Sequence, residues 1–297
     1  MTERLADINA RIDGIGQLKA VVNAMRGIAA ARAQQARSQL TAVDSYAATI
    51  AAAIGRALAL APTARPGAAR QSMRPALVLF CAEQGFAGAF SERMLDVAGA
   101  DLAKSELFLI GTRGGIAAAE RNVTAGWKTP MPSHSLGIPK LADTIAQALY
   151  ARIASGEIGR LDAVFSERQP GHAIEVKRRR LFPFDPAQFP RPSDTNAPIV
   201  NLAPEALLRA LAADYLHAQL CNAALHAFAA ENEARMEAMA AARNQIERQL
   251  SELQATQRHV RQEEITAEII ELAAGETASR QELTSSLALG LERHRSR

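Results

Sequence analysis

The chain has 297 residues, a formal net charge of +3 and 48% hydrophobic residues. These proportions are typical of a folded protein and exclude a disordered tail, and the length allows one or two domains. Aromatic residues make up only 4% of the chain, so we expect long alanine-rich helices rather than a bulky aromatic core. The small net charge lacks the dense cationic surface that would by itself indicate nucleic-acid binding.

Cysteine content and the N-terminal residues bear on the compartment. The two cysteines, Cys81 and Cys221, form no CxxC pair, which favours a reducing compartment. The first residues, MTERLADINARIDG, contain acids and lack the apolar run of a signal peptide. No stretch approaches about 20 uncharged apolar residues, so we expect no membrane-spanning segment.

Residues 1–61 are predicted to form a single N-terminal coiled-coil helix, because no proline occurs before Pro62. Apolar side chains recur there at spacings of three and four: Leu5, Ile8, Ile12, Ile15, Leu18, Val22, Met25 and Ala29. This pattern predicts a hydrophobic stripe along one face of the helix. Residues 62–75, PTARPGAARQSMRP, then predict a linker.

Residues 76–200 are predicted to form a central α/β domain. Short apolar runs predict strands at 76–81, 107–110, 161–165 and 174–181, and helices are expected over 89–103, 113–121 and 138–153. Strands that alternate with helices over this length favour a mostly parallel sheet covered by helices. Five prolines between Pro183 and Pro198 predict an irregular exit segment.

Residues 201–276 are predicted to form a C-terminal coiled-coil helix, which begins near Pro204 and ends near Gly275. At 1.5 Å per residue this helix would be about 100 Å long. Its apolar residues follow a seven-residue period: Met239, Ile246, Leu253 and Val260, with Met236 and Leu250 at the companion position. Such a period predicts a supercoil with a partner helix, here the N-terminal helix running antiparallel. Residues 277–297 are predicted to be a basic C-terminal extension.

The sequence lacks the common motifs of catalytic sites. It has no GxxxxGK[ST] loop, and the turn from Gly85 to Gly88 lacks the GxGxxG spacing of a dinucleotide site. His217 and Cys221 stand one helical turn apart, as metal ligands can, but no second pair accompanies them. We therefore expect no catalytic, cofactor or metal site, and interpret the chain as no enzyme on its own.

Four segments carry a resemblance to a known family. Residues 235–239, RMEAM, are followed by Asn244, and residues 261–269 read RQEEITAEI. These segments resemble the RMxAM and RQxxITxE blocks of gamma subunits of F-type (rotary) ATP synthases. The first helix is similar to that family's first helix at Ile12, Gln17, Lys19, Ala24, Met25 and residues 28–32. The turn at 82–88 is similar to its acidic–Gly–Leu–Cys–Gly turn.

The chain also departs from the family's usual pattern. Gly27 stands where a methionine is usual, Arg26 where an acid is common, and Ala87 where the turn has its cysteine. The chain also continues for about 20 residues past Gly275, where the family ends. In these departures the chain resembles a gamma subunit of an alternative or second-copy F-type complex.

The resemblance implies the non-catalytic central rotor shaft of an ATP synthase, which couples ion flow through a membrane ring to ATP synthesis or hydrolysis. Its implied partners are a hexameric ring of alpha and beta subunits, the epsilon subunit and the membrane c-ring, with no nucleic acid and no direct membrane span. The implied location is peripheral, on the cytoplasmic face of a bacterial inner membrane. The implied contact or coupling residues are Lys19, Met25, Arg26, Arg32, Arg235, Met239, Gln262, Thr266 and Glu268.

A basic stretch leaves a second interpretation open. Residues 14–43 contain Lys19, Arg26, Arg32 and Arg37 and no acid. In the family such side chains face acidic loops of beta, whereas a solvated basic helix face is the simpler alternative. A coiled-coil scaffold could also use this stretch to bind nucleic acid or anionic surfaces. That function would need aromatic groups for stacking among the basic residues, and the single Trp127 lies in the middle domain.

Overall fold

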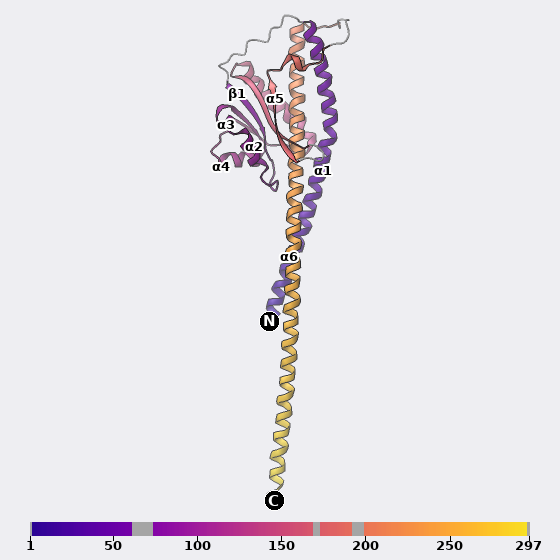
Figure 1. Ribbon diagram of the computed structural model, residues 1–297, viewed down its shortest axis with the longest axis vertical. Helices are drawn as coiled ribbons and strands as arrows, with labels where there is room; N and C mark the ends of the chain where they lie inside the picture. Colours follow the sequence, from indigo (N-terminus) through magenta and orange to yellow (C-terminus); the bar gives the residue numbers. More distant parts are fainter. Residues whose placement is uncertain (1, 61–73, 169–172, 192–198, 296–297) are drawn as a thin grey trace. The chain divides into compact units, whose positions relative to one another are not determined.

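The computed structural model describes residues 2–60, 74–168, 173–191 and 199–295. The chain divides into two compact units. We call residues 1–23 with 241–297 the two-helix unit, and residues 24–240 the sheet unit. Two long helices contribute to both units: α1 (Thr2–Leu60) and α6 (Pro204–Arg295) (Figure 1).

In the two-helix unit, α1 and α6 run antiparallel. Three polar pairs join them: Arg4–Glu263 at 3.9 Å, Asn9–Gln257 at 2.5 Å and Lys19–Glu247 at 3.0 Å. Residue numbers therefore fall along α6 as they rise along α1. Ile8 and Val22 are buried on α1, and Ile246 and Val260 are buried on α6. The predicted antiparallel coiled coil and its seven-residue stripe are confirmed.

The predicted end of the C-terminal helix near Gly275 is wrong, because α6 continues to Arg295. A glycine inside a helix costs only about 1 kcal/mol relative to alanine. Gly275 is not among the described glycines with positive φ, and no proline follows it. The residues that flank it are good helix formers, so nothing local ends the helix there. The boundary predicted at residue 277 falls inside α6.

The sheet unit contains a five-stranded sheet in the order β3-β2-β1-β4-β5. Its strands are β1 (Arg74–Phe80), β2 (Glu106–Ile110), β3 (Trp127–Thr129), β4 (Ile158–Arg168) and β5 (Ile174–Phe182). Among the described strands only the β4–β5 pair is antiparallel, which confirms the mostly parallel sheet. The sequence reading missed β3, since a three-residue strand with half-buried ends shows no continuous apolar run.

The helices between the strands are α2 (Phe90–Ala98), α3 (Asp101–Lys104), α4 (Thr112–Glu120) and α5 (Ile138–Ala154), with 3-10 turns at Ser135–Gly137 and Pro186–Gln188. The single helix predicted over 89–103 is instead two helices. The chain bends at Gly99, whose φ of 45° is left-handed and suits a residue without a Cβ atom. The helices expected at 113–121 and 138–153 are confirmed as α4 and α5.

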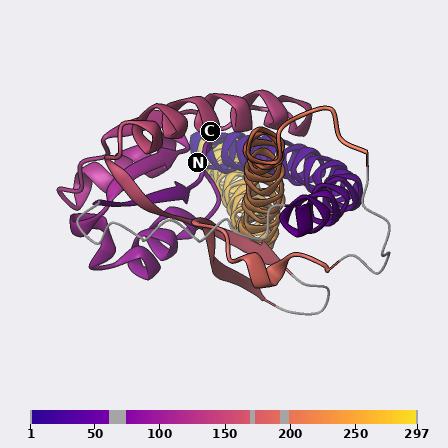
Figure 2. The same ribbon diagram turned by 90° about the horizontal axis from the view of Figure 1, so that it is seen from above.

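Two hydrophobic cores cover the faces of the sheet. On β1, Ala76, Val78 and Phe80 point to the core that contains α5 and α6, and Leu77 and Leu79 point to the core that contains α2 and α4. Seen from above, α6 lies beside the sheet (Figure 2). Residues 216–235 of α6 are buried or half-buried throughout, as expected of a helix that is packed on every side.

One stretch of α1, Arg4–Leu60, contains a window apolar enough by composition to cross a membrane, with a mean hydropathy of 1.2. We expected no such stretch, and the difference arises because alanine raises the mean hydropathy without supplying large side chains. Core helices of water-soluble proteins pass the same test. A single helix of this kind is therefore weak support for a membrane span.

Candidate functional site

The carboxyl end of β1 leads into the loop of residues 82–88, which a buried carboxylate on α6 holds in place. Glu231 Oε2 accepts a hydrogen bond from the backbone N–H of Glu83, and Oε1 accepts one from Gln84, both at 3.1 Å. Glu231 is only 3% exposed. Burying an ionised carboxylate is unfavourable unless donors surround it, so these two amides are a large part of why it can lie there.

Arg235, one turn along α6, completes this arrangement. Its guanidinium lies 2.5 Å from Glu231 Oε1, and it donates to the carbonyl of Gly85 at 3.1 Å and to the side chain of Asn232 at 2.9 Å. Arg235 is 5% exposed. We call Glu231, Asn232, Arg235 and the backbone of residues 83–85 the Glu231 clasp. It joins α6 to the loop through two buried side chains of opposite charge that pair with each other and with the loop backbone.

The side chain of Glu83 extends the clasp to the next strands. Its carboxylate accepts hydrogen bonds from the N–H and hydroxyl of Thr112, at 2.9 and 2.8 Å, and from the N–H of Met131 at 2.9 Å. Thr112 begins α4, whose N-terminal end favours a negative charge. Glu83 therefore ties the loop to the segments that follow β2 and β3.

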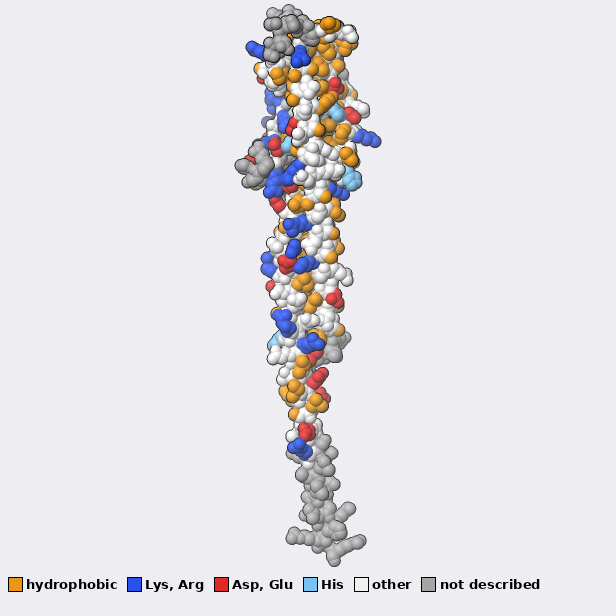
Figure 3. Space-filling view, turned by 90° about the vertical axis from the view of Figure 1, so that its right-hand side faces the viewer, with side chains coloured by type: hydrophobic (Ala, Val, Ile, Leu, Met, Phe, Trp, Pro, Cys, Tyr) orange, Lys and Arg blue, Asp and Glu red, His pale blue; other side chains and the backbone are white. Residues whose placement is uncertain are grey.

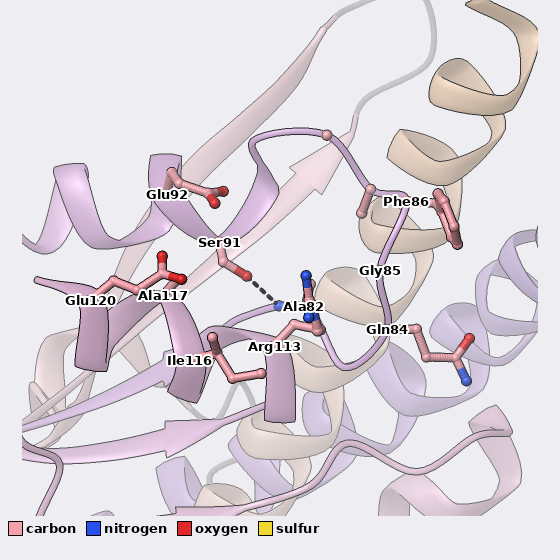
Figure 4. Close-up of a pocket in the computed structure, with 12 residues that line it drawn as sticks. Ala82, Gln84, Gly85, Phe86, Ser91, Glu92, Arg113, Ile116, Ala117 and Glu120 are labelled. Carbon is pink, nitrogen blue, oxygen red and sulfur yellow. Dashed lines mark hydrogen bonds between the residues drawn. The ribbon is translucent and has the colours of Figure 1, made fainter. Parts of the chain in front are cut away.

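The outer side of the loop borders a small cavity of about 90 Å³ (Figure 4). The N–H of Ala82 donates to Ser91 at 3.2 Å there, and the Arg113 side chain lies across the cavity from Glu92. Phe86 at the tip of the loop is 66% exposed and has a φ of 62°. A non-glycine residue held in this left-handed region costs free energy, which the anchoring at residues 83–85 offsets.

A second buried carboxylate, Glu233, lies near the end of β4. It forms ion pairs with Arg37 of α1 and with Arg168 of β4, the latter at 3.5 Å, and Arg168 also contacts Glu237 at 3.0 Å. Arg37, Arg168 and Glu233 line part of a cavity of about 280 Å³. The pairs connect α1, α6 and β4 inside the sheet unit.

Asp162 on β4 is the third buried carboxylate, and three guanidinium groups surround it. Arg160, Arg178 and Arg180 contact it at 2.7, 2.8 and 3.5 Å. Burial alone raises the pKa of Asp162, but the hydrogen bonds and charges of Arg160 and Arg178 outweigh burial and hold the pKa below its usual 3.8. The carboxylate is therefore more favourable in the folded chain than in the unfolded one.

This shift predicts a dependence of stability on pH. A lowered pKa in the folded state contributes stability above the unfolded pKa near 3.8, and that contribution is lost as the pH falls through the folded pKa. We expect Asp162→Asn to lower the free energy of unfolding by about 1–3 kcal/mol at pH 7. Urea denaturation at pH 7 and pH 3 should show the difference between variant and wild type shrink at the lower pH.

Asp96→Asn is the matched control, since Asp96 pairs with Arg121 but has a 65% exposed side chain. Exposed pairs contribute about 0–1 kcal/mol, so this variant should differ little from wild type at either pH. A gap between Asp162→Asn and wild type that stays constant down to pH 3 would contradict the assignment.

The structure places the predicted contact residues in different environments. Arg235 and Met239 are buried, at 5% and 4% exposure, and their contact with a partner stays a prediction. Both lie on the part of α6 that belongs to the sheet unit. Arg32 donates to the Gln84 side chain at 3.3 Å, and Arg235 donates to the Gln84 carbonyl at 3.4 Å. The structure therefore brings Arg32 and Arg235 together at one loop.

The other predicted contact residues are more accessible. Arg26 is exposed and Met25 half-buried on α1, and Gln262, Thr266 and Glu268 are exposed on α6 of the two-helix unit. Lys19 is half-buried and pairs with Glu247. Hydrogen bonds from Lys19 and Arg243 lower the pKa of Glu247. Direct contact between these accessible predicted residues and a partner stays a prediction.

Two of the four basic residues in the acid-free stretch at 14–43 form ion pairs within the described chain. Lys19 pairs with Glu247, Arg37 pairs with Glu233, and Arg32 donates to Gln84. On the face drawn in Figure 3, basic side chains are interspersed with acidic and neutral ones. This arrangement provides little of the continuous positive surface that a polyanion would need.

His217 and Cys221 are neighbours on α6, with the sulfur 3.8 Å from His217 Nε2. Burial and the charge of Asp143 raise the pKa of the Cys221 thiol to about 12, so it stays protonated and unreactive at neutral pH. Within the described ranges, no group of three or more His, Cys, Asp and Glu residues is arranged to hold a metal ion.

The sequence reading missed the three buried carboxylates of Glu231, Glu233 and Asp162. A signal for the first was present, because Glu231 directly follows eight residues, AALHAFAA, that contain no formal charge. A carboxylate at the end of such a run is a candidate for a buried, paired group. Nothing in the sequence identifies Glu83 and Gln84 as its partners.

Comparison with known proteins identifies the family. Residues 4–278 match the model of a family described as ATP synthase. Gamma chains of ATP synthase from Moorella thermoacetica and a Parafrankia strain are 27% and 28% identical, over 92% and 94% of this chain and 98% of each relative.

Solved structures share the fold. A chain in the cryo-EM structure of the Euglena gracilis mitochondrial ATP synthase, OSCP/F1/c-ring, covers 94% of this chain with a TM-score of 0.62 at 12% identity. A chain in the cryo-EM structure of the Tetrahymena thermophila mitochondrial ATP synthase, central stalk/c-ring, covers 75% of this chain with a TM-score of 0.55 at 15% identity. The matched fold, the family model and the curated relatives agree: the chain belongs to the ATP synthase gamma-chain family.

Proposed function

We propose that this chain is the non-catalytic central rotor shaft of an ion-translocating F-type ATP synthase. Its rotation would couple ion flow through a membrane ring to ATP synthesis or hydrolysis in the beta subunits. The observation that carries the proposal is the antiparallel pairing of α1 and α6 through the two-helix unit. A pair of helices with charged outer faces and a narrow apolar seam is suited to turn inside a ring of other subunits.

The proposed partners are alpha and beta subunits in a hexameric ring, an epsilon subunit and a membrane c-ring. The Euglena structure with a similar fold is described as OSCP, F1 and c-ring, which supports this set. The proposed location is peripheral, on the cytoplasmic face of a bacterial inner membrane. Whether protons or sodium ions drive the rotor depends on the membrane ring, not on this chain.

The proposed coupling residues fall into two groups according to their exposure. Lys19, Met25, Arg26, Arg32, Gln262, Thr266 and Glu268 are exposed or half-buried, and we propose them as contacts with the surrounding ring. Arg235 and Met239 are buried, and we propose that they act indirectly by fixing α6 within the sheet unit. Exposed charges at such an interface affect the alignment of the two partners and their rate of association more than their affinity.

Co-purification tests the proposal. A tagged full-length chain, produced in its own host, is expected to bring down alpha and beta subunits in stoichiometric amounts, together with ATPase activity. The same tag on an unrelated coiled-coil protein provides the background. Recovery of the chain alone at low ionic strength would contradict the proposal, and recovery with nucleic acid instead would favour the scaffold alternative.

A charge placed at Met25 tests coupling within that complex. Met25 is half-buried on α1, and Met25→Lys would put a cation where an apolar side chain borders the ring. We expect ATP synthesis to fall several-fold, by about 10-fold if the lost contact is worth 1.4 kcal/mol, while ATP hydrolysis falls less. Membrane vesicles from the host allow both rates to be measured on one preparation.

Met25→Leu is the control for this variant, because it keeps the volume and the apolar character. It should leave both rates close to wild type. An equal loss of synthesis and hydrolysis in Met25→Lys would indicate misassembly and contradict a role in coupling.

A further inference from the structure

We infer that Glu231 is a built-in anionic ligand of the α/β part of the chain. Its carboxylate occupies the crevice at the carboxyl end of β1, where open α/β sheets bind small anions from outside. The inference goes beyond the rotor function, because it says how this sheet binds its own long helix. It also assigns a binding site for a small carboxylate, which Glu231 fills.

The position of the loop supports the first step. In the strand order β3-β2-β1-β4-β5, β2 and β3 are added on one side of β1, and β4 and β5 on the other. The order in which successive strands are added therefore reverses between β1 and β4. In open α/β sheets, ligands bind at such a reversal, outside the carboxyl ends of the strands. The loop 82–88 leaves β1 there, and Arg168, the last residue of β4, reaches Glu233 and Glu237 of α6. Residues 231–237 of α6 therefore lie across both strand ends.

The donors supply the second step. Two successive backbone N–H groups, from Glu83 and Gln84, each reach a different oxygen of the same carboxylate at 3.1 Å. Converging backbone amides of this kind are how α/β proteins hold phosphate and carboxylate groups. Arg235 adds a charged donor at 2.5 Å, which strengthens the interaction as a guanidinium does for an external anion.

Burial supplies the third step. Glu231 is 3% exposed and Arg235 is 5% exposed, so the site is shielded from water in the described structure. Shortening Glu231 to alanine would remove its outer CH₂ and the carboxylate, leaving two amides without an acceptor and the Arg235 guanidinium without its counter-ion around a space of that size. Acetate has the same heavy atoms as the missing group, a carboxylate with one attached carbon, so it is the external anion chosen for the test.

Thermal unfolding of full-length Glu231→Ala in sodium acetate and in sodium chloride of equal ionic strength tests the inference. In chloride the midpoint is expected about 6–12 °C below wild type, because an arginine and two amides lose their buried partner. Acetate is expected to restore at least half of this loss in a saturable way. Wild type should give the same midpoint in both salts.

Two variants make the comparison specific. Glu237→Ala removes an acid from the same helix, but its side chain is 63% exposed and contacts only Arg168 in the described structure, so its midpoint should change by about 2 °C or less in either salt. Glu231→Gln keeps the volume of the side chain and leaves no room for acetate. It should be destabilised without any response to acetate.

An equal effect of acetate and chloride on Glu231→Ala would overturn the inference, as would an acetate response of the same size in Glu231→Gln. If Glu231→Ala does not fold in chloride, the refolding yield in the two salts replaces the midpoint, and equal yields overturn the inference. None of these outcomes bears on the rotor function, which the co-purification experiment tests separately.

Discussion

Replacing Arg235 with alanine is expected to lower the free energy of unfolding by about 3–5 kcal/mol. The reason is the carboxylate that remains: Glu231 would keep its charge at 3% exposure with only the two backbone amides as donors. The carbonyl of Gly85 and the side chain of Asn232 would lose a donor as well. Urea denaturation of the full-length chain, followed by circular dichroism, measures the change.

Arg243→Ala is the matched control on the same helix. Arg243 forms the same kind of one-turn pair, with Glu247 at 3.0 Å, but its side chain is 40% exposed, so its loss should cost about 0–1 kcal/mol. The double variant Glu231→Ala with Arg235→Ala should be less destabilised than the sum of the single changes, because it leaves no buried ion behind. Additive losses would show that the two groups are not coupled.

The architecture was largely predictable from the sequence because its signals are local. The seven-residue stripe of Ile246, Leu253 and Val260 predicts a paired helix, and the apolar runs at 76–81 and 161–165 predict buried strands. The failures concern helix ends predicted near glycines. Gly99 breaks the helix predicted at 89–103, whereas Gly275 does not end α6. The same residue type has opposite outcomes because tertiary packing decides whether a left-handed turn forms.

The clasp could not be predicted, because its partners are far apart in the sequence. Glu83 and Glu231 are 148 residues apart, and only the folded sheet brings the end of β1 to α6. The family resemblance singles out Arg235. The burial of Arg235, however, depends on how many helices and strands surround α6 near this residue. The stripe pattern predicts one buried face, whereas residues 216–235 are covered on nearly all sides. Alanine accounts for the discrepancy, since it suits exposed and buried helix positions alike.

Gly114 is expected to tolerate no side chain. A Cβ atom built on it would lie 2.0 Å from the Cβ of Cys81 and 2.9 Å from its sulfur. Both Cβ atoms are fixed by the backbone, so no rotamer change relieves the contact, and α4 would have to move away from the end of β1. We expect Gly114→Ala to lower the free energy of unfolding by about 3 kcal/mol, at the upper end for an overpacked core.

The adjacent glycine provides the comparison, because it lies in the same turn of α4. The nearest atom to a Cβ on Gly115 is Leu109 Cδ2, at an ordinary contact distance of 4.0 Å. Gly115→Ala should therefore stabilise the chain by up to about 1 kcal/mol through its higher helix propensity. Because Gly114 also donates its N–H to Ala82 at 3.1 Å, a displaced α4 would pull on the loop that Glu231 holds. Equal stability of the two alanine variants would mean that α4 does not pack this closely on β1.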